Sequence, residues 1–230
     1  MEATRARLTE ETLDLAVREL AARDPDLRAI VERFGPPPLW DRTPGFATLV
    51  HIVLEQQVSL ASAQAAFDRL CAAVDVLTPD RFLELDDAEL LSIGFSRQKA
   101  RYVRDLARAV ATGTLDLENL ASLPDEDVHR ALVAQTGIGP WTASIYLLMV
   151  LGRPDVWPAT DMALATAVAE VKGLARRPDA TQMQALAMVW APWRSVAARL
   201  FWHDYLGRRG RSVPGPTPGG LPPAPARPAG

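Results

Sequence analysis

Helical periodicity runs through most of the 230-residue chain and constrains the fold more than any other feature. Apolar residues recur at intervals of three and four, and no stretch alternates convincingly as a β-strand does. Helix boundaries interrupt this pattern: Thr9 can cap a first helix, Pro25 separates it from a second, and Gly94 is a candidate C-cap. We therefore expect about ten helices and an all-α fold.

The amino-acid composition excludes several classes of protein. Apolar residues make up 48% of the chain, enough for a sizeable core, and no apolar run reaches the ~18 residues of a membrane span. Cys71 is the only cysteine, so an internal disulfide and a cysteine-ligated zinc or iron–sulfur site are excluded. The three histidines lack ligand spacing, and the N-terminus lacks the layout of a signal peptide. We expect a cytoplasmic protein without membrane contact or a side-chain metal site.

Charge is distributed unevenly along the chain. Residues 1–90 carry nine basic and 17 acidic side chains, whereas residues 91–230 carry 16 and 11. The basic half contains "SRQKARYVRDLAR", which by itself is typical of a solvated helix face. At the far end, residues 213–230 contain seven prolines and no aliphatic cluster. We expect a disordered tail there.

The stretch "TGIGPWTA" carries the first candidate site. Gly137 and Gly139 can adopt positive φ and leave their N–H groups uncovered, and Pro140 suits the first turn of a following helix. The free N–H groups at a helix start bind phosphate readily. A plain turn between two helices explains the same residues, so the motif alone leaves both interpretations open.

Asp161 carries the second candidate site, one helix further on. Aspartate is a preferred N-cap, and a helix begins here. The neighbouring Thr160 could cap instead, which would free the carboxylate for catalysis.

Taken together, these segments resemble the helix-hairpin-helix DNA glycosylase superfamily. The hairpin "GIGPWTA" is followed by an apolar helix, a proline-bearing loop and an aspartate at the next helix start. "LEQQVSLASAQAAF" is similar to the superfamily's glutamine-containing helix, and "GFSRQKARYVRDLA" to its glycine-then-lysine helix. "WAPWRSVAARLFWHDY" resembles the last helix of the alkylated-base branch, the 3-methyladenine DNA glycosylases. The match covers roughly residues 46–206.

The resemblance implies two helical subdomains with a cleft between them, in the compact form without an N-terminal β domain. We expect residues 46–155 to form the central one, which contains the hairpin. Residues 1–45 and 156–212 would form the other, which carries the aspartate.

The resemblance also implies the substrate and the site. The expected substrate is damaged double-stranded DNA, and the resemblance implies a monomeric enzyme that flips and releases alkylated purines such as 3-methyladenine and 7-methylguanine. Asp161 is then the catalytic carboxylate. The expected DNA contacts are Thr136, Gly137, Ile138, Gly139, Pro140, Thr142, Gln56, Gln57, Ser96 and Lys99. The expected base pocket is formed by Trp141, Trp202, Tyr146 and Trp193. A lone tryptophan more often belongs to the core, and only the resemblance favours the pocket for Trp202.

Departures from relatives refine these expectations. Relatives that also cut the strand carry a lysine where this chain has Trp141, so we expect no strand cleavage. Compact relatives insert a wedge near Gln57, which is polar here, so the wedge residue stays unassigned. We expect no cofactor except a candidate monovalent cation on the carbonyls of Thr136 and Ile138.

Two other functions remain open on the sequence. A non-catalytic DNA-binding module would keep the hairpin and lose the chemistry, and the presence of Asp161 favours the enzyme over it. An all-helical interaction protein without nucleic acid would show no salt-dependent affinity for DNA.

Overall fold

The computed structural model describes residues 7–210, and every regular element in that range is a helix, as the sequence predicts. The α-helices are α1 (Glu10–Arg23), α2 (Pro25–Phe34), α3 (Phe46–Glu55), α4 (Leu60–Ala73), α5 (Pro79–Glu84), α6 (Asp87–Ile93), α7 (Arg97–Ala111), α8 (Asp125–Val133), α9 (Pro140–Ile145), α10 (Met162–Val171), α11 (Ala180–Ala187) and α12 (Arg194–Arg208). Short 3₁₀ segments are η2 (Asn119–Ser122) and η4 (Met188–Trp190), and η3 (Tyr146–Val150) is a π-helical continuation of α9.

The helix ends follow the local signals of the sequence. Thr9 caps α1 in a capping box with Thr12, and Pro25 occupies the first turn of α2 behind the Asp24 cap. Gly94 ends α6 in the left-handed conformation, with φ of 112°. These boundaries depend on neighbouring residues alone, which is why the sequence predicts them.

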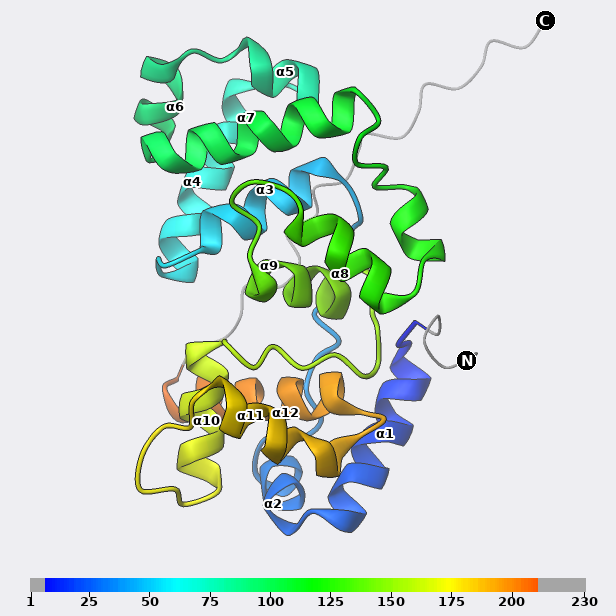
Figure 1. Cartoon of the computed structure of the whole chain (residues 1–230). Coiled ribbons are helices and arrows are strands. Elements are labelled where there is room, and N and C mark those ends of the chain that lie inside the picture. Colours follow the sequence, from blue (N-terminus) through cyan, green and yellow to red (C-terminus); the bar gives the residue numbers. More distant parts are fainter. Residues whose placement is uncertain (1–6, 211–230) are drawn as a thin grey trace, which may run out of the picture.

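The helices form two groups (Figure 1). In one, which we call the hairpin lobe, α3 packs on α4, α7 and α9, and α8 packs on α9. In the other, the carboxylate lobe, α12 packs on α1, α2 and α10. The chain passes between the lobes through residues 35–45 and again through residues 151–161.

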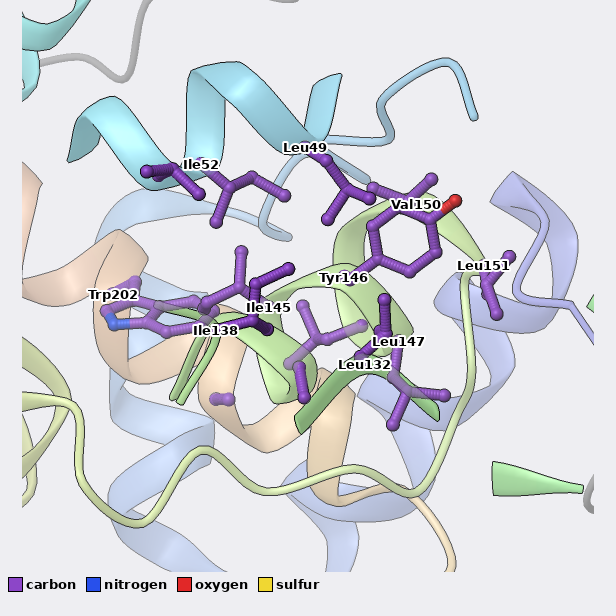
Figure 2. Close-up of a cluster of buried hydrophobic side chains, with 14 of the residues drawn as sticks. Leu49, Ile52, Leu132, Ile138, Ile145, Tyr146, Leu147, Val150, Leu151 and Trp202 are labelled. Carbon is purple, nitrogen blue, oxygen red and sulfur yellow. The ribbon is translucent and has the colours of Figure 1, made fainter. Parts of the chain in front are cut away.

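A shared core joins the lobes. Trp202 of α12 lies beside Ile138 and Ile145 of the hairpin lobe in a buried apolar cluster (Figure 2). Each such buried side chain contributes roughly 1.5–3 kcal/mol relative to an exposed position. The two lobes are therefore packed against each other through this apolar cluster.

Among residues 7–210, no helix is long and apolar enough to cross a membrane. The disordered tail predicted for residues 213–230 lies outside the described residues.

Candidate active site

A cleft of about 1390 Å³ separates the hairpin from the start of α10. Its lining comes from the α3–α4 turn, the first turns of α7, the α8–α9 hairpin and the first residues around Asp161. The two segments that the sequence singled out, the glycine turn and the aspartate, therefore face one cleft from different lobes.

The two hairpin glycines do different things. Gly137 has φ of 82°, and a Cβ there would lie 2.1 Å from Cγ of Tyr102, so the turn requires glycine. Gly139 has φ of −91° and would point a Cβ into open space. The expectation of positive φ is thus wrong for Gly139, whose missing side chain instead leaves the start of α9 uncovered.

The N–H groups at this turn are only partly free. The N–H of Ile138 donates to the carbonyl of Gln135 at 3.1 Å, and its side chain is buried in the core. The prediction that this N–H is available to a phosphate is therefore wrong. The N–H groups of Gly139 and Trp141 flank Pro140 at the start of α9, where a helix offers its donors no internal partner.

Several residues predicted to contact DNA form hydrogen bonds within the protein that support the hairpin. The side-chain amide of Gln56 donates to the carbonyl of Gly137 and to Oγ1 of Thr142, each at 2.9 Å. Lys99 Nζ donates to the carbonyls of Leu54 and Gln56 at 2.7 and 2.8 Å. These side chains line the cleft, but their polar groups are bonded within the protein.

Two further residues of this set lie at turns. Ser96 caps α7 and accepts the N–H of Lys99. Gln57 is exposed on the α3–α4 turn with φ of 58°, a left-handed conformation that few non-glycine residues adopt.

Asp161 is both a helix cap and a presented carboxylate. Its Oδ1 accepts the N–H of Leu164 at 2.7 Å, so the suggestion that Thr160 caps α10 in its place is wrong. Its Oδ2 accepts the indole N–H of Trp141 at 2.7 Å, and Oδ1 also accepts that of Trp202 at 3.3 Å. Three neutral donors from three segments thus fix the carboxylate at the cleft.

Charge distinguishes Asp161 from the other carboxylate that lines the cleft. Glu55 forms two hydrogen bonds with the guanidinium of Arg42, at 2.8 and 3.1 Å, and is neutralised by it. No cation of the described residues forms an ion pair with Asp161. An uncompensated anion beside a cleft attracts positive charge, whether already on a ligand or developing in a reaction.

The four predicted aromatic residues have different positions. Trp141 is partly exposed and lines the cleft. Trp202 is 8% exposed and supports Asp161 from the core, without lining the cleft. The sequence predicts Trp202 in the base pocket, but in the structure its indole N–H donates to the carboxylate instead.

Tyr146 and Trp193 do not belong to the cleft. Tyr146 is fully buried and is drawn well apart from Trp202 in the core cluster (Figure 2), and burial raises the pKa of its phenol to about 12. Trp193 donates its indole N–H to Glu19 of α1 at 2.6 Å. The prediction of a base pocket at these two positions is wrong, because the Tyr146 ring is buried in the core and the Trp193 ring is bonded to α1.

The structure adds cleft residues that the sequence did not single out. Tyr102 packs under Gly137, and the exposed Val58 and Met162 line the rim. Tyr102 follows Lys99 by three residues on α7, so helical spacing from a suspected site residue was a usable signal. In the described residues, no group of three or more histidine, cysteine, aspartate or glutamate side chains could hold a metal ion.

Both the sequence and the fold are similar to those of known proteins. Residues 50–192 match the model of the family described as "HhH-GPD superfamily base excision DNA repair protein". YfjP of Bacillus subtilis is 32% identical over 186 residues, which are 77% of this chain and 65% of YfjP. The DNA-3-methyladenine glycosylase of the same organism is 28% identical over 202 residues, 80% of this chain and 65% of that protein. The chain therefore spans about two thirds of the length of these relatives.

A solved structure with a similar fold is the 3-methyladenine DNA glycosylase Mag1 of Schizosaccharomyces pombe in complex with abasic DNA. Its TM-score is 0.77 at 25% identity, over 81% of this chain and 94% of that one.

Proposed function

The chain belongs to the HhH-GPD superfamily of base excision DNA repair proteins, and from this premise we propose that it is a DNA glycosylase that releases alkylated purines from double-stranded DNA. The observation that carries the proposal is the Asp161 carboxylate, which three neutral donors hold at the cleft without a neutralising cation. Relatives named DNA-3-methyladenine glycosylase support the same substrate class.

We assign DNA binding to the hairpin side of the cleft and the chemical step to the Asp161 side. The uncovered start of α9 around Gly139 holds a DNA phosphate beside the lesion, and the damaged nucleotide turns out of the duplex into the cleft. As the glycosidic bond lengthens, the sugar becomes positively charged. Asp161 stabilises that charge and orients or deprotonates the attacking water, so no separate general acid is required for a base that already carries positive charge.

Aromatic contact supplies the selectivity. The cleft-lining Trp141 offers its face to a cationic base, a contact worth about 0.5–2 kcal/mol. Trp202 does not contact the base and instead holds the Asp161 carboxylate through its indole N–H. A neutral oxidised base gains less from this face and is a poorer leaving group, so 3-methyladenine and 7-methylguanine are released faster than 8-oxoguanine.

The enzyme does not cut the strand. Strand cleavage requires an amine at the reacting carbon, and the chain has two lysines. Lys172 lies at the far end of α10 in contact with Asp24 and Asp26. Lys99 lines the cleft, but its amine donates to the carbonyls of Leu54 and Gln56. Borohydride trapping on lesion DNA yields no covalent adduct, and an adduct that disappears in Lys99→Gln would assign lyase chemistry to Lys99.

A monovalent cation at the hairpin remains part of the proposal. The carbonyl of Gly137 accepts a hydrogen bond from Gln56, so the carbonyls of Thr136 and Ile138 would hold such an ion, which would supply positive charge for a DNA phosphate. We also propose that the protein works as a monomer in the cytoplasm, on nucleoid DNA.

The test is base release from randomly methylated DNA, with each released base resolved by chromatography. Release of 3-methyladenine and 7-methylguanine well above release of 8-oxoguanine from a matched duplex supports the proposal. Salt-dependent DNA binding without release of any base would favour the non-catalytic DNA-binding module instead.

A further inference from the structure

A buried arginine lies where the two lobes meet, and the proposed reaction does not use it. The side chain of Arg199 on α12 is fully buried. Its guanidinium has three backbone carbonyls as partners and, among the described residues, no carboxylate within ion-pair distance.

The three carbonyls come from three different segments. Nε donates to the carbonyl of Leu39 in the linker between the lobes, and Nη2 donates to the carbonyl of Leu148 in η3, the continuation of α9, each at 2.8 Å. Nη1 donates to Ser195, one turn earlier on α12 itself, at 3.2 Å. One side chain therefore joins both lobes and the linker that connects them.

The carbonyl of Leu148 is available because its helix ends there. The last carbonyls of a helix have no internal partner. In this helix, Leu147 accepts the N–H of Arg153, Met149 accepts the N–H of Arg42, and Leu148 is left for Arg199. A cation at this end also interacts favourably with the helix dipole.

Burial lowers the pKa of the Arg199 guanidinium to about 10, so the side chain stays charged at neutral pH. An apolar side chain of similar volume could fill such a position at little cost or even with a gain in stability. The rigid fork of an arginine, by contrast, fixes the relative positions of the groups it bonds. That geometry points to alignment as the use of the residue.

The joined helices are the two that hold Asp161 in place. Trp202 follows Arg199 by three residues and so lies on the same side of α12. The helix that ends near Leu148 begins at Pro140 and carries Trp141. Both indoles donate to the carboxylate.

We propose that Arg199 is a positioning residue that sets the hairpin lobe and the carboxylate lobe at the separation required for base release. This inference rests on the proposed function. DNA contacts belong to the hairpin lobe and the carboxylate to the other, so a shift between lobes moves the charge relative to the sugar without weakening DNA binding. Misplacement of about 1 Å can cost about 10²-fold in rate.

The experiment compares Arg199→Lys and Arg199→Met with Arg153→Lys as a matched control. Arg153 is also a buried arginine, but it forms an ion pair with Asp125 and donates to the carbonyls of Ala121 and Leu123, and all three partners lie in the hairpin lobe. Single-turnover base release and lesion-DNA affinity are measured on each folded variant. We expect the rate to fall about tenfold or more in both Arg199 variants with Kd changed less than about threefold, and Arg153→Lys to lower Tm without changing the rate.

A second readout does not depend on activity. In ¹⁵N-tryptophan spectra, the indole N–H signals of Trp141 and Trp202 should shift in Arg199→Lys. The signal of Trp190, which donates to Asp24 inside the carboxylate lobe, should stay. Unmoved Trp141 and Trp202 signals, or equal rate losses in the Arg199 and Arg153 variants, would overturn the proposal. Absence of base release in the wild type would refute the proposed function, and the indole shifts would still decide the role of Arg199.

Discussion

Two aspartates cap helices of the carboxylate lobe, and their surroundings begin alike. Asp24 starts α2 and Asp161 starts α10, with 7% and 9% of their surfaces exposed. Each accepts a backbone N–H of its own helix and an indole N–H, from Trp190 at 2.8 Å and from Trp141 at 2.7 Å.

The difference is a cation. Lys172 Nζ lies 2.8 Å from both oxygens of Asp24. Burial alone would raise the pKa of Asp24, but the bonds from Lys172 and Trp190 outweigh it and hold the pKa below its ordinary value. Asp161 has a second indole, from Trp202, in place of the ammonium, and it faces the cleft. An aspartate at a helix cap thus serves structure where a cation neutralises it, as at Asp24. It is available for chemistry where only neutral donors hold it, as at Asp161.

The strongest test of this comparison exchanges each aspartate for asparagine. Asp161→Asn keeps a side chain that can cap but removes the negative charge, so base release should fall by about 10²–10³-fold or more while DNA affinity is retained. Asp24→Asn is the matched control and should leave the single-turnover rate of the folded protein unchanged. Base release at the wild-type rate by Asp161→Asn would remove this carboxylate from the mechanism.

The indole donors can be compared in the same way. Trp141→Phe keeps an aromatic face but deletes one hydrogen bond to a charged group, worth about 1.5–3 kcal/mol. Base release should slow about tenfold or more if that bond serves the reaction. Trp190→Phe deletes the equivalent bond to Asp24 and should lower the free energy of unfolding without slowing release. Similar kinetics in both variants would show that the two sites do not differ in function.

Removal of the cation should affect folding alone. Lys172→Met leaves the Asp24 carboxylate without its charged partner and should lower the free energy of unfolding by roughly 1.5–3 kcal/mol at neutral pH. Because the pKa of Asp24 is depressed in the folded state, this stabilisation is present above the ordinary value of 3.8 and is lost as pH falls below it. Denaturant titrations of wild type and variant should therefore converge in acid, and a difference that persists unchanged at pH 2 would contradict the ion-pair explanation.

The smallest expected effect comes from giving Asp161 a cation of its own. Met162 follows Asp161, is 66% exposed and lines the cleft. Met162→Lys should slow base release up to about fivefold, since an exposed ion pair is worth ~0–1 kcal/mol, and added salt should reverse part of the loss. Met162→Gln controls for the lost thioether. A faster reaction in Met162→Lys would mean that the charge of Asp161 is not what the cleft supplies.

Local signals explain which site residues the sequence predicts well. The glycine turn, Pro140 at the start of α9 and the Asp161 cap follow from neighbouring residues, and the structure has each of them. Similarity in position along the chain predicts Trp202, Tyr146 and Trp193 as base-pocket residues. Helix packing instead places the Trp202 ring against the carboxylate, the Tyr146 ring in the core and the Trp193 ring against Glu19.

Periodicity and capping act over a few residues, so local sequence alone specifies the all-helical fold, the helix ends and the position of Asp161 at the start of a helix. Packing of the helices brings Trp141 and Trp202, 20 and 41 residues away, to that carboxylate, and it brings Lys172 to Asp24, 148 residues away. Whether a buried aspartate is neutralised or left charged at a cleft depends on such distant partners, which are brought together only when the lobes pack.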